Sequence, residues 1–211
     1  MHRFFKRRFL LKLCPVATIV VLYLFLFELF PVLFPLTQEE ARLNYTPSWQ
    51  IYDRNGLLLR EAVNSEGLTA IWVSLEDVDP FFLNALMAAE DERFYKHRGI
   101  DSRAILRAML QNFQAVEIKS GASTISMQLA RIVKGHKRNL WGKFAQMITA
   151  RRLEQGMSKD DILEMYINRI ALGRGNMGIE AASKEYFGIS QNLMSRGQMS
   201  LLAGIIKGPG I

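Results

Sequence analysis

The chain has 211 residues, enough for one domain with an appendage, and 49 % of them are hydrophobic, which is enough for a sizeable core. Cys14 is the only cysteine, which excludes an intrachain disulfide and a cysteine-based metal site. The net charge of +7 is unevenly distributed along the chain, and five basic residues precede residue 13. Between Ile118 and Leu153 there are eight basic residues and no acidic residue. This basic block indicates an anionic partner such as phosphate, nucleic acid or a membrane surface.

The N-terminal segment has the composition of a membrane anchor. No charge occurs from Leu13 to Phe27, and the apolar run continues past Glu28 to Phe34. Counted from Phe9, the run reaches the roughly 20 residues that a spanning helix requires. It lacks the small-residue end of a cleaved signal peptide, and basic residues precede it. We therefore predict an uncleaved single-pass anchor with a cytoplasmic N-terminus, which places everything after Leu36 outside the cytoplasm.

Residues 37–48 are predicted to form a polar juxtamembrane linker, and the region from Trp49 to Val73 is the only one with β character. Asn55-Gly56 lies between two apolar runs and is a strong hairpin-turn signal. Ile71-Trp72-Val73 is expected to add a third strand. The predicted organisation is a basic N-terminus and anchor over 1–36, a linker and hairpin region over 37–73, and a helical domain over 74–211.

The helical domain is predicted to begin with Asp79 as an N-cap and Pro80 at the first helical position. Glu90, in the last turn of this helix, continues its apolar stripe. The stripe consists of Leu83, Leu86 and Met87.

A carboxylate in an apolar stripe is costly unless it is paired or its pKa rises. A carboxylate poised in this way suits a general base near neutral pH. The alternative is a helix-end glutamate that pairs with Arg93 or His97. Spacing alone leaves both interpretations of Glu90 open, because structural ion pairs also perturb pKa values.

The next two helices follow Asp101 and Gly121. Asp101 and Ser102 can cap a helix with the apolar positions Ile105, Leu106, Met109, Leu110 and Phe113. Ser123 is expected to cap the second helix, whose core stripe is Ile125, Leu129, Ile132 and Val133.

A second face of the helix after Ser123 carries Thr124, Gln128 and Arg131 at positions i, i+4 and i+7. A hydroxyl, an amide and a guanidinium aligned near a helix N-terminus can hold phosphate oxygens. The alternative is a solvated polar face. The surrounding basic block favours the phosphate interpretation.

Further helices are predicted over roughly 142–155, from Ser158, over 179–187 and from Ser195 to Lys207. Lys143 and Gln146 share a face of the first, and Trp141 before it is of the type that favours a membrane interface. The buried stripe of the second is Ile162, Leu163, Tyr166, Ile167 and Ile170. The pattern G-x-G-x-x-G at 173–178 follows a helix instead of a strand, so it is interpreted as a turn and not as a dinucleotide site.

Four motifs carry a family resemblance. They are Glu90-Asp91-x-x-Phe94-x-x-His97-x-Gly99-x-Asp101, then Gly121-Ala122-Ser123-Thr124-Ile125-x-x-Gln128-x-x-Arg131, then Ser158-Lys159-x-x-Ile162-Leu163-x-x-Tyr166-x-Asn168, and Gly178-x-x-Ala181-Ala182-x-x-Tyr186-Phe187-Gly188. In this order they resemble motifs one, two, four and five of the peptidoglycan glycosyltransferases, glycosyltransferase family 51, which form the transglycosylase domains of class A penicillin-binding proteins. The segment 127–131 most resembles the 1C subtype.

The resemblance implies a mainly α, lysozyme-like domain on the outer face of the bacterial cytoplasmic membrane. Its substrate would be lipid II, a disaccharide-pentapeptide on undecaprenyl diphosphate. The resemblance implies that Glu90 takes the proton from the acceptor 4-hydroxyl, that the resulting nucleophile displaces the diphosphate in one inverting step, and that Gln146 occupies the second catalytic position. Arg131 and Lys143 would stabilise the leaving diphosphate. The other substrate-binding residues it implies are Asp91, Phe94, His97, Ser123, Thr124 and Gln128.

Two departures from the family pattern stand out. Its third motif is Arg-Lys-x-x-Glu, whereas this chain has Gly142-Lys143-Phe144-Ala145-Gln146. An amide can hydrogen-bond a phosphate or a sugar but brings no charge to a metal. No metal site is therefore predicted and no cofactor is expected to be required, with the role of a divalent cation (Mg or Mn) left open. The chain also ends where the family continues, so we expect this form to expose part of the apolar face of its last helix and to be weak as a polymerase.

Two other classes of protein stay open. A lysozyme-like muramidase or lytic transglycosylase would also use one glutamate on a helical fold, but it would not need an anchor beside a basic block. An inactive or truncated transferase would act as a membrane-anchored cell-wall scaffold. The expected partners are lipid II with the growing glycan strand, membrane lipids and cell-wall synthesis proteins. Nucleic acid is not expected, because the predicted topology places the basic block outside the cytoplasm.

Overall fold

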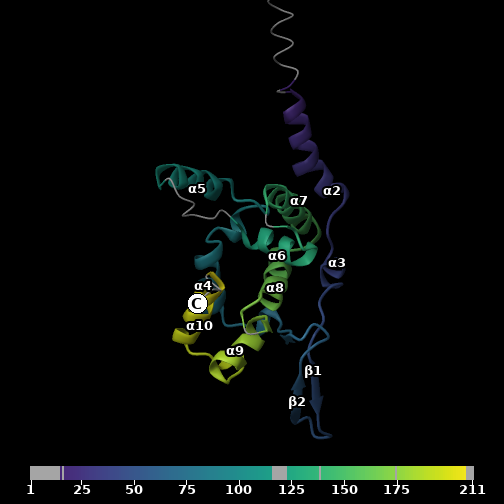
Figure 1. Cartoon of the computed structure of the whole chain (residues 1–211), viewed down its shortest axis with the longest axis vertical. Helices are drawn as coiled ribbons and strands as arrows, with labels where there is room; N and C mark the ends of the chain where they lie inside the picture. Colours follow the sequence, from purple (N-terminus) through teal and green to yellow (C-terminus); the bar gives the residue numbers. More distant parts are fainter. Residues whose placement is uncertain (1–14, 16, 116–122, 138, 174, 208–211) are drawn as a thin grey trace, which may run out of the picture.

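The computed structural model describes residue 15 and residues 17–115, 123–137, 139–173 and 175–207. An N-terminal helix enters a helical body at one end, and a β-hairpin projects from the other (Figure 1). The mainly helical fold predicted from the sequence is confirmed. The elements that follow the N-terminal helix are η1 Phe25–Leu29, α2 Phe30–Leu33, α3 Gln38–Arg42, β1 Trp49–Tyr52, β2 Leu58–Ala62, β3 Thr69–Ala70, η2 Leu75–Asp77, α4 Pro80–Glu90, η3 Phe94–Lys96, α5 Ser102–Ala115, α6 Ile125–Lys134, α7 Leu140–Gly156, α8 Lys159–Arg169, β4 Asn176–Met177, α9 Ile179–Phe187, η4 Gln191–Leu193 and α10 Arg196–Lys207.

The N-terminal segment is helical over 17–24 and continues without a break into the π-helical turn η1 and then α2. Within the described residues, no helix combines the length and the apolar character needed to cross a bilayer. The start of the predicted anchor and the basic cluster before it lie outside the described residues.

A buried arginine on α7 fastens this N-terminal helix to the body. The Arg151 guanidinium donates to the backbone carbonyl of Phe27 at 2.9 Å and to Oε2 of Glu28 at 2.6 Å. It also donates to the carbonyl of Arg98 at 3.1 Å. The Phe27 ring packs edge-on against Phe144 of α7, with 5.4 Å between ring centroids. A cation that is 6 % exposed thus meets a carboxylate and two carbonyl oxygens, which satisfies its donors where water is excluded.

The connection from this helix to the body passes very close to the end of α7. The backbone N–H of Leu36 donates to the carbonyl of Arg152 at 3.0 Å. A Cβ added to Gly156 would lie 2.3 Å from the carbonyl oxygen of Leu36. Glycine at the end of α7 is therefore needed for close approach of two backbones.

The hairpin predicted around Asn55-Gly56 is confirmed, with β1 and β2 antiparallel. Its turn is held by the Asp53 carboxylate, which accepts from the backbone N–H groups of Asn55 and Leu57. The third strand expected at 71–73 is wrong. The strand that forms is β3, two residues earlier, and it pairs in parallel with β4 more than a hundred residues later in the chain.

Most predicted helix starts are confirmed by their capping bonds. The Asp79 carboxylate accepts from the N–H of Phe81 at 2.7 Å and begins α4. Ser158 and Asp161 form a reciprocal capping box at α8. Gly178 stands at the N-cap of α9, and the chain turns from α8 to α9 before it, as expected. The segment is not only a turn, because Asn176–Met177 forms β4, so the prediction that 49–73 is the only region with β character is wrong.

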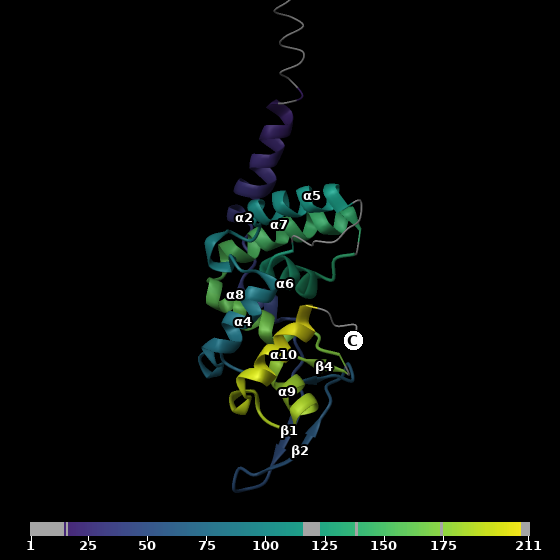
Figure 2. The same ribbon diagram turned by 90° about the vertical axis from the view of Figure 1, so that its left-hand side faces the viewer.

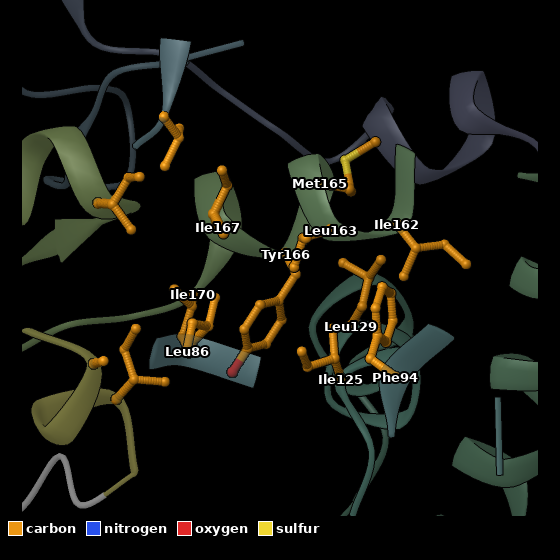
Figure 3. Packing of buried hydrophobic residues seen from close by; sticks show 14 of the residues in the cluster. Leu86, Phe94, Ile125, Leu129, Ile162, Leu163, Met165, Tyr166, Ile167 and Ile170 are labelled. Carbon is orange, nitrogen blue, oxygen red and sulfur yellow. The ribbon is translucent and has the colours of Figure 1, made fainter. Parts of the chain in front are cut away.

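The core gathers around α8. The five predicted stripe residues of α8 are all buried, and Figure 3 shows them packed with Leu86 of α4 and with Ile125 and Leu129 of α6. α10 packs on α4 and buries Met199, Leu202 and Ile206. Leu201, on the opposite face of α10, is 57 % exposed, so only part of its apolar surface faces solvent.

Helices α5 and α7 lie at the end of the body where the N-terminal helix enters (Figures 1 and 2). The predicted cap of α5 is confirmed, since the Asp101 carboxylate accepts from the N–H groups of Arg103 and Ala104. More than half of each of the following side chains is exposed: Leu106, Met109 and Leu110 on α5, and Leu140 and Trp141 on α7.

Candidate active site

Glu90 is the last residue of α4, and its side chain is half-buried. Gln128 of α6 donates from Nε2 to Oε2 of Glu90 at 2.6 Å. Within the described part of the chain, Oε1 of Glu90 has no hydrogen-bond partner. The bond therefore fixes the carboxylate and leaves one oxygen available to a substrate proton.

The alternative of a helix-end ion pair for Glu90 is wrong in this structure, because both proposed partners are engaged elsewhere. Arg93 lies 3.6 Å from Oδ1 of Asp101. His97 bonds to Asp91. Among the described residues, the hydrogen-bond partner of the Glu90 carboxylate is thus an amide, and neither Arg93 nor His97 pairs with it.

Asp91 ties the end of α4 to the start of α6. Its Oδ2 accepts from the backbone N–H of Ile125, the first residue of α6, at 3.0 Å. His97 Nε2 lies 3.0 Å from each carboxylate oxygen. A carboxylate at a helix N-terminus complements the partial positive charge there. Asp91 is 7 % exposed, so this residue, with His97, holds α6 from within the protein and thereby places Gln128 beside Glu90.

Thr124, and not Ser123 as predicted, caps α6. The Thr124 hydroxyl accepts from the N–H of Met127 at 3.1 Å and donates to the carbonyl of Gly99 at 2.6 Å. With 2 % of its surface exposed and its hydroxyl fully used, Thr124 sets the start of the helix. The three residues predicted to share one phosphate-binding face therefore have three different roles. Thr124 is a buried helix cap, Gln128 binds Glu90, and Arg131 is an exposed cation.

The cations of the site come from two helices. Arg131 is exposed on α6, three residues after Gln128. Lys143 on α7 is half-buried and donates from Nζ to Oγ of Ser123. Burial lowers the pKa of Lys143, and the nearby Arg131 charge lowers it further. Among the described residues, neither cation forms an ion pair with a carboxylate, which leaves both able to bind an anion.

Gln146 lies one turn after Lys143 and is 6 % exposed. Its amide forms no hydrogen bond with another described residue. The described residues hold no group of three or more His, Cys, Asp or Glu side chains placed to bind a metal ion. The side chain at this position is an uncharged amide, which is a weak ligand for a divalent metal ion. No catalytic step is therefore assigned to a metal ion.

Phe94 lies in the core with 1 % of its surface exposed. Lys159 Nζ sits 4.2 Å from its ring centroid, and the His97 ring meets it edge-on. Contact with substrate, which the resemblance implied for Phe94, finds no support in this geometry. Its side chain instead supports the loop that carries His97, through packing and a cation–π contact.

One residue of this site was given no role there from the sequence, which placed it in a buried stripe and in the fourth motif. Tyr166 of α8 is fully buried, and its hydroxyl donates to Oε1 of Gln128 at 3.1 Å. The signal for such a role is general: a buried tyrosine hydroxyl needs a polar partner. The partner lies 38 residues away in the chain, so sequence alone does not name it.

These residues define a class of site. In a helical domain, one oxygen of a carboxylate is held by an amide, and the other has no hydrogen-bond partner among the described residues. The two cations of the site likewise have no carboxylate partner in the described ranges. This arrangement suits acid–base chemistry on a substrate that carries negative charge.

The comparisons agree with this class. The family described as Transglycosylase matches residues 56–211, and the chain belongs to that family. It is 39 % identical over 176 residues to penicillin-binding protein 2D of Bacillus subtilis (strain 168), which covers 80 % of this chain and 25 % of the relative. It is 34 % identical over 177 residues to penicillin-binding protein 1C of Escherichia coli (strain K12), covering 84 % and 22 %. It is 38 % identical over 153 residues to the biosynthetic peptidoglycan transglycosylase of Nitrosospira multiformis, covering 72 % and 66 %.

The relatives differ in length and subtype. The chain spans a quarter or less of the penicillin-binding proteins cited above and about two thirds of the biosynthetic transglycosylase. Penicillin-binding proteins named 1A, 1C and 2D match at similar identities, so the 1C subtype suggested by residues 127–131 is not singled out.

Proposed function

We propose that this chain is a peptidoglycan glycosyltransferase that joins lipid II units into glycan strands and releases undecaprenyl diphosphate. The observation that carries the proposal is Oε1 of Glu90, which has no hydrogen-bond partner among the described residues, while Gln128, on the helix that also carries Arg131, holds Oε2. Membership of the transglycosylase family and the name of the Nitrosospira multiformis relative support the same reaction class.

The reaction needs one proton acceptor and one stabilised leaving group. Glu90 Oε1 takes the proton of the acceptor sugar 4-hydroxyl as its oxygen forms a bond to C1 of the donor sugar. The bond between C1 and the diphosphate oxygen breaks on the opposite face, which inverts the configuration at C1. The proton ends on Glu90 and the electron pair on the diphosphate, so charge balance is kept without a covalent intermediate.

Arg131 and Lys143 face the charge that develops on the leaving diphosphate. Because burial and a neighbouring cation lower the pKa of Lys143, its proton is held less firmly in the free protein. A bound diphosphate compensates both effects, since an opposite charge favours the ionised lysine. Preorganised cations of this kind stabilise a transition state more than a ground state when charge grows during the reaction.

The proposal also places the domain at a membrane, with a single N-terminal anchor and the catalytic domain on its outer face. Support comes from the apolar run after the basic N-terminus and from the exposed apolar side chains on α5 and α7. Trp141, 81 % exposed at the start of α7, is a residue type that favours the bilayer interface. A lipid-linked substrate would then be presented beside the site.

Incubation of the detergent-solubilised chain with fluorescently labelled lipid II tests the proposal. Glycan polymers resolved on a gel would support it. Lipid II binding without any polymer would indicate a scaffold instead. Shortening of preformed glycan strands would assign the chain to the muramidases or lytic transglycosylases.

A further inference from the structure

Within the described part of the chain, the hydroxyl of Tyr166 forms one hydrogen bond, and its partner is the amide that holds Glu90. Figure 3 shows its ring among apolar side chains, with the hydroxyl as the polar atom at its tip. The hydroxyl donates to Oε1 of Gln128 at 3.1 Å, and Nε2 of the same amide donates to Glu90 at 2.6 Å. The three side chains come from α8, α6 and α4. A buried donor therefore stands behind the amide that holds the base.

An amide has two ends with opposite hydrogen-bonding character, and little else distinguishes them. When its oxygen accepts from Tyr166, its NH2 group must face Glu90. If the amide turned over, its oxygen would face the carboxylate and two acceptors would meet. We propose that Tyr166 is a positioning residue for glycosyl transfer: its hydroxyl holds the amide oxygen of Gln128 and so stabilises the orientation in which the NH2 group donates to Glu90. This inference rests on the proposed role of Glu90.

Burial and the surrounding charges keep the hydroxyl of Tyr166 protonated, so it retains a proton to donate. Burial raises its pKa above the ordinary value, the negative charges of Glu90 and Asp91 raise it further, and Arg131 lowers it. Tyr166 thus keeps near neutral pH the proton that it donates to Gln128. No other side chain among the described residues forms a hydrogen bond with Oε1 of Gln128.

The test removes only the hydroxyl, with Tyr166→Phe in the full chain. Tyr186→Phe is the matched control, because it removes one hydroxyl that donates to a backbone carbonyl, that of Leu172, at 2.7 Å. On lipid II, we expect Tyr166→Phe to lower kcat about tenfold, the value of one hydrogen bond, with little change in KM. We expect the acidic limb of the pH–rate profile to move to higher pH, because an unanchored amide no longer favours the ionised base. Tyr186→Phe should leave the rate and the profile unchanged.

Two further measurements separate positioning from simple packing. In a Gln128→Met background, which keeps the volume and removes the amide, Tyr166→Phe should cause no further loss of rate. An additive loss would show that Tyr166 acts by another route and would overturn the inference.

The third measurement does not need enzymatic activity, so it separates failure of this inference from failure of the proposed function. The side-chain NH2 protons of Gln128 are assigned in 15N-labelled chain by their absence in Gln128→Met. Their exchange with solvent should be slow in the original chain and faster in Tyr166→Phe. Unchanged exchange would overturn the positioning role even in a chain that does not polymerise lipid II. Faster exchange in a chain without polymerase activity would keep the positioning role and remove the proposed reaction.

Discussion

The buried carboxylate of Asp91 gives the sharpest test of how the site is assembled. It receives the N–H of the first residue of α6 at 3.0 Å and lies 3.0 Å from His97 Nε2 through both of its oxygens. Asp91→Asn replaces a charged acceptor with a neutral one at a helix N-terminus. We expect a loss of about 1.5–3 kcal/mol in the free energy of unfolding, the range for hydrogen bonds to charged groups. Asp91→Ala removes the carboxylate from both contacts and should cost more, about 3–5 kcal/mol, because the N–H of Ile125 and the His97 ring both lose a buried partner.

Asp161 supplies the matched control, because it also caps a helix but near the surface. It accepts from the N–H and hydroxyl of Ser158 at the start of α8. Asp161→Asn should cost only about 0.3–1 kcal/mol, as for an exposed charge at a helix N-terminus. Urea unfolding followed by circular dichroism measures all three variants. If Asp91→Asn costs no more than Asp161→Asn, the argument that Asp91 fastens α6 from within is refuted.

Two other predictions follow from single contacts. Lys143→Met should raise the melting temperature at pH 7 while it lowers polymerisation, because burial and Arg131 disfavour the charged lysine. This stability gain should shrink as the pH rises from the lowered pKa of Lys143 in the folded state to the ordinary value of 10.5. Above 10.5 the lysine is neutral in both the folded and the unfolded chain. A stability gain that does not depend on pH would contradict this explanation. Gly156→Ala should destabilise by about 1–3 kcal/mol, since its Cβ would lie 2.3 Å from the carbonyl oxygen of Leu36. Gly204→Ala, in open space on α10, should be neutral or stabilising, and equal effects of the two changes would argue against close backbone approach.

Local signals in the sequence were sufficient for most helix starts. Asp79, Asp101 and Ser158 act within one turn of their own residues, so their capping roles can be read without tertiary structure. The cap of α6 was misplaced by one residue. Ser123 and Thr124 are both good caps, and the choice depends on the carbonyl of Gly99, which lies in another segment.

Pairings between distant segments could not be predicted. The expected strand at 71–73 formed at Thr69–Ala70 instead, because its partner β4 comes from the other end of the domain. The resemblance singled out Glu90 and Gln128, but the bond between them and its extension to Tyr166 join three helices. Such contacts depend on how α4, α6 and α8 pack, and a periodic pattern predicts only that each helix has a buried face.

The role of Glu90 as the general base is the central claim. Glu92, an exposed glutamate two residues later, supplies the matched control. Glu90→Gln preserves the size of the side chain and removes the proton acceptor. The measurement is the initial rate of glycan polymer formation from labelled lipid II by the original chain, Glu90→Gln and Glu92→Gln, with circular dichroism to confirm the fold of each. We expect the rate to fall about 10²–10⁴-fold in Glu90→Gln and to stay unchanged in Glu92→Gln. A Glu90→Gln chain that polymerises at the original rate would contradict the account and assign the base to another residue.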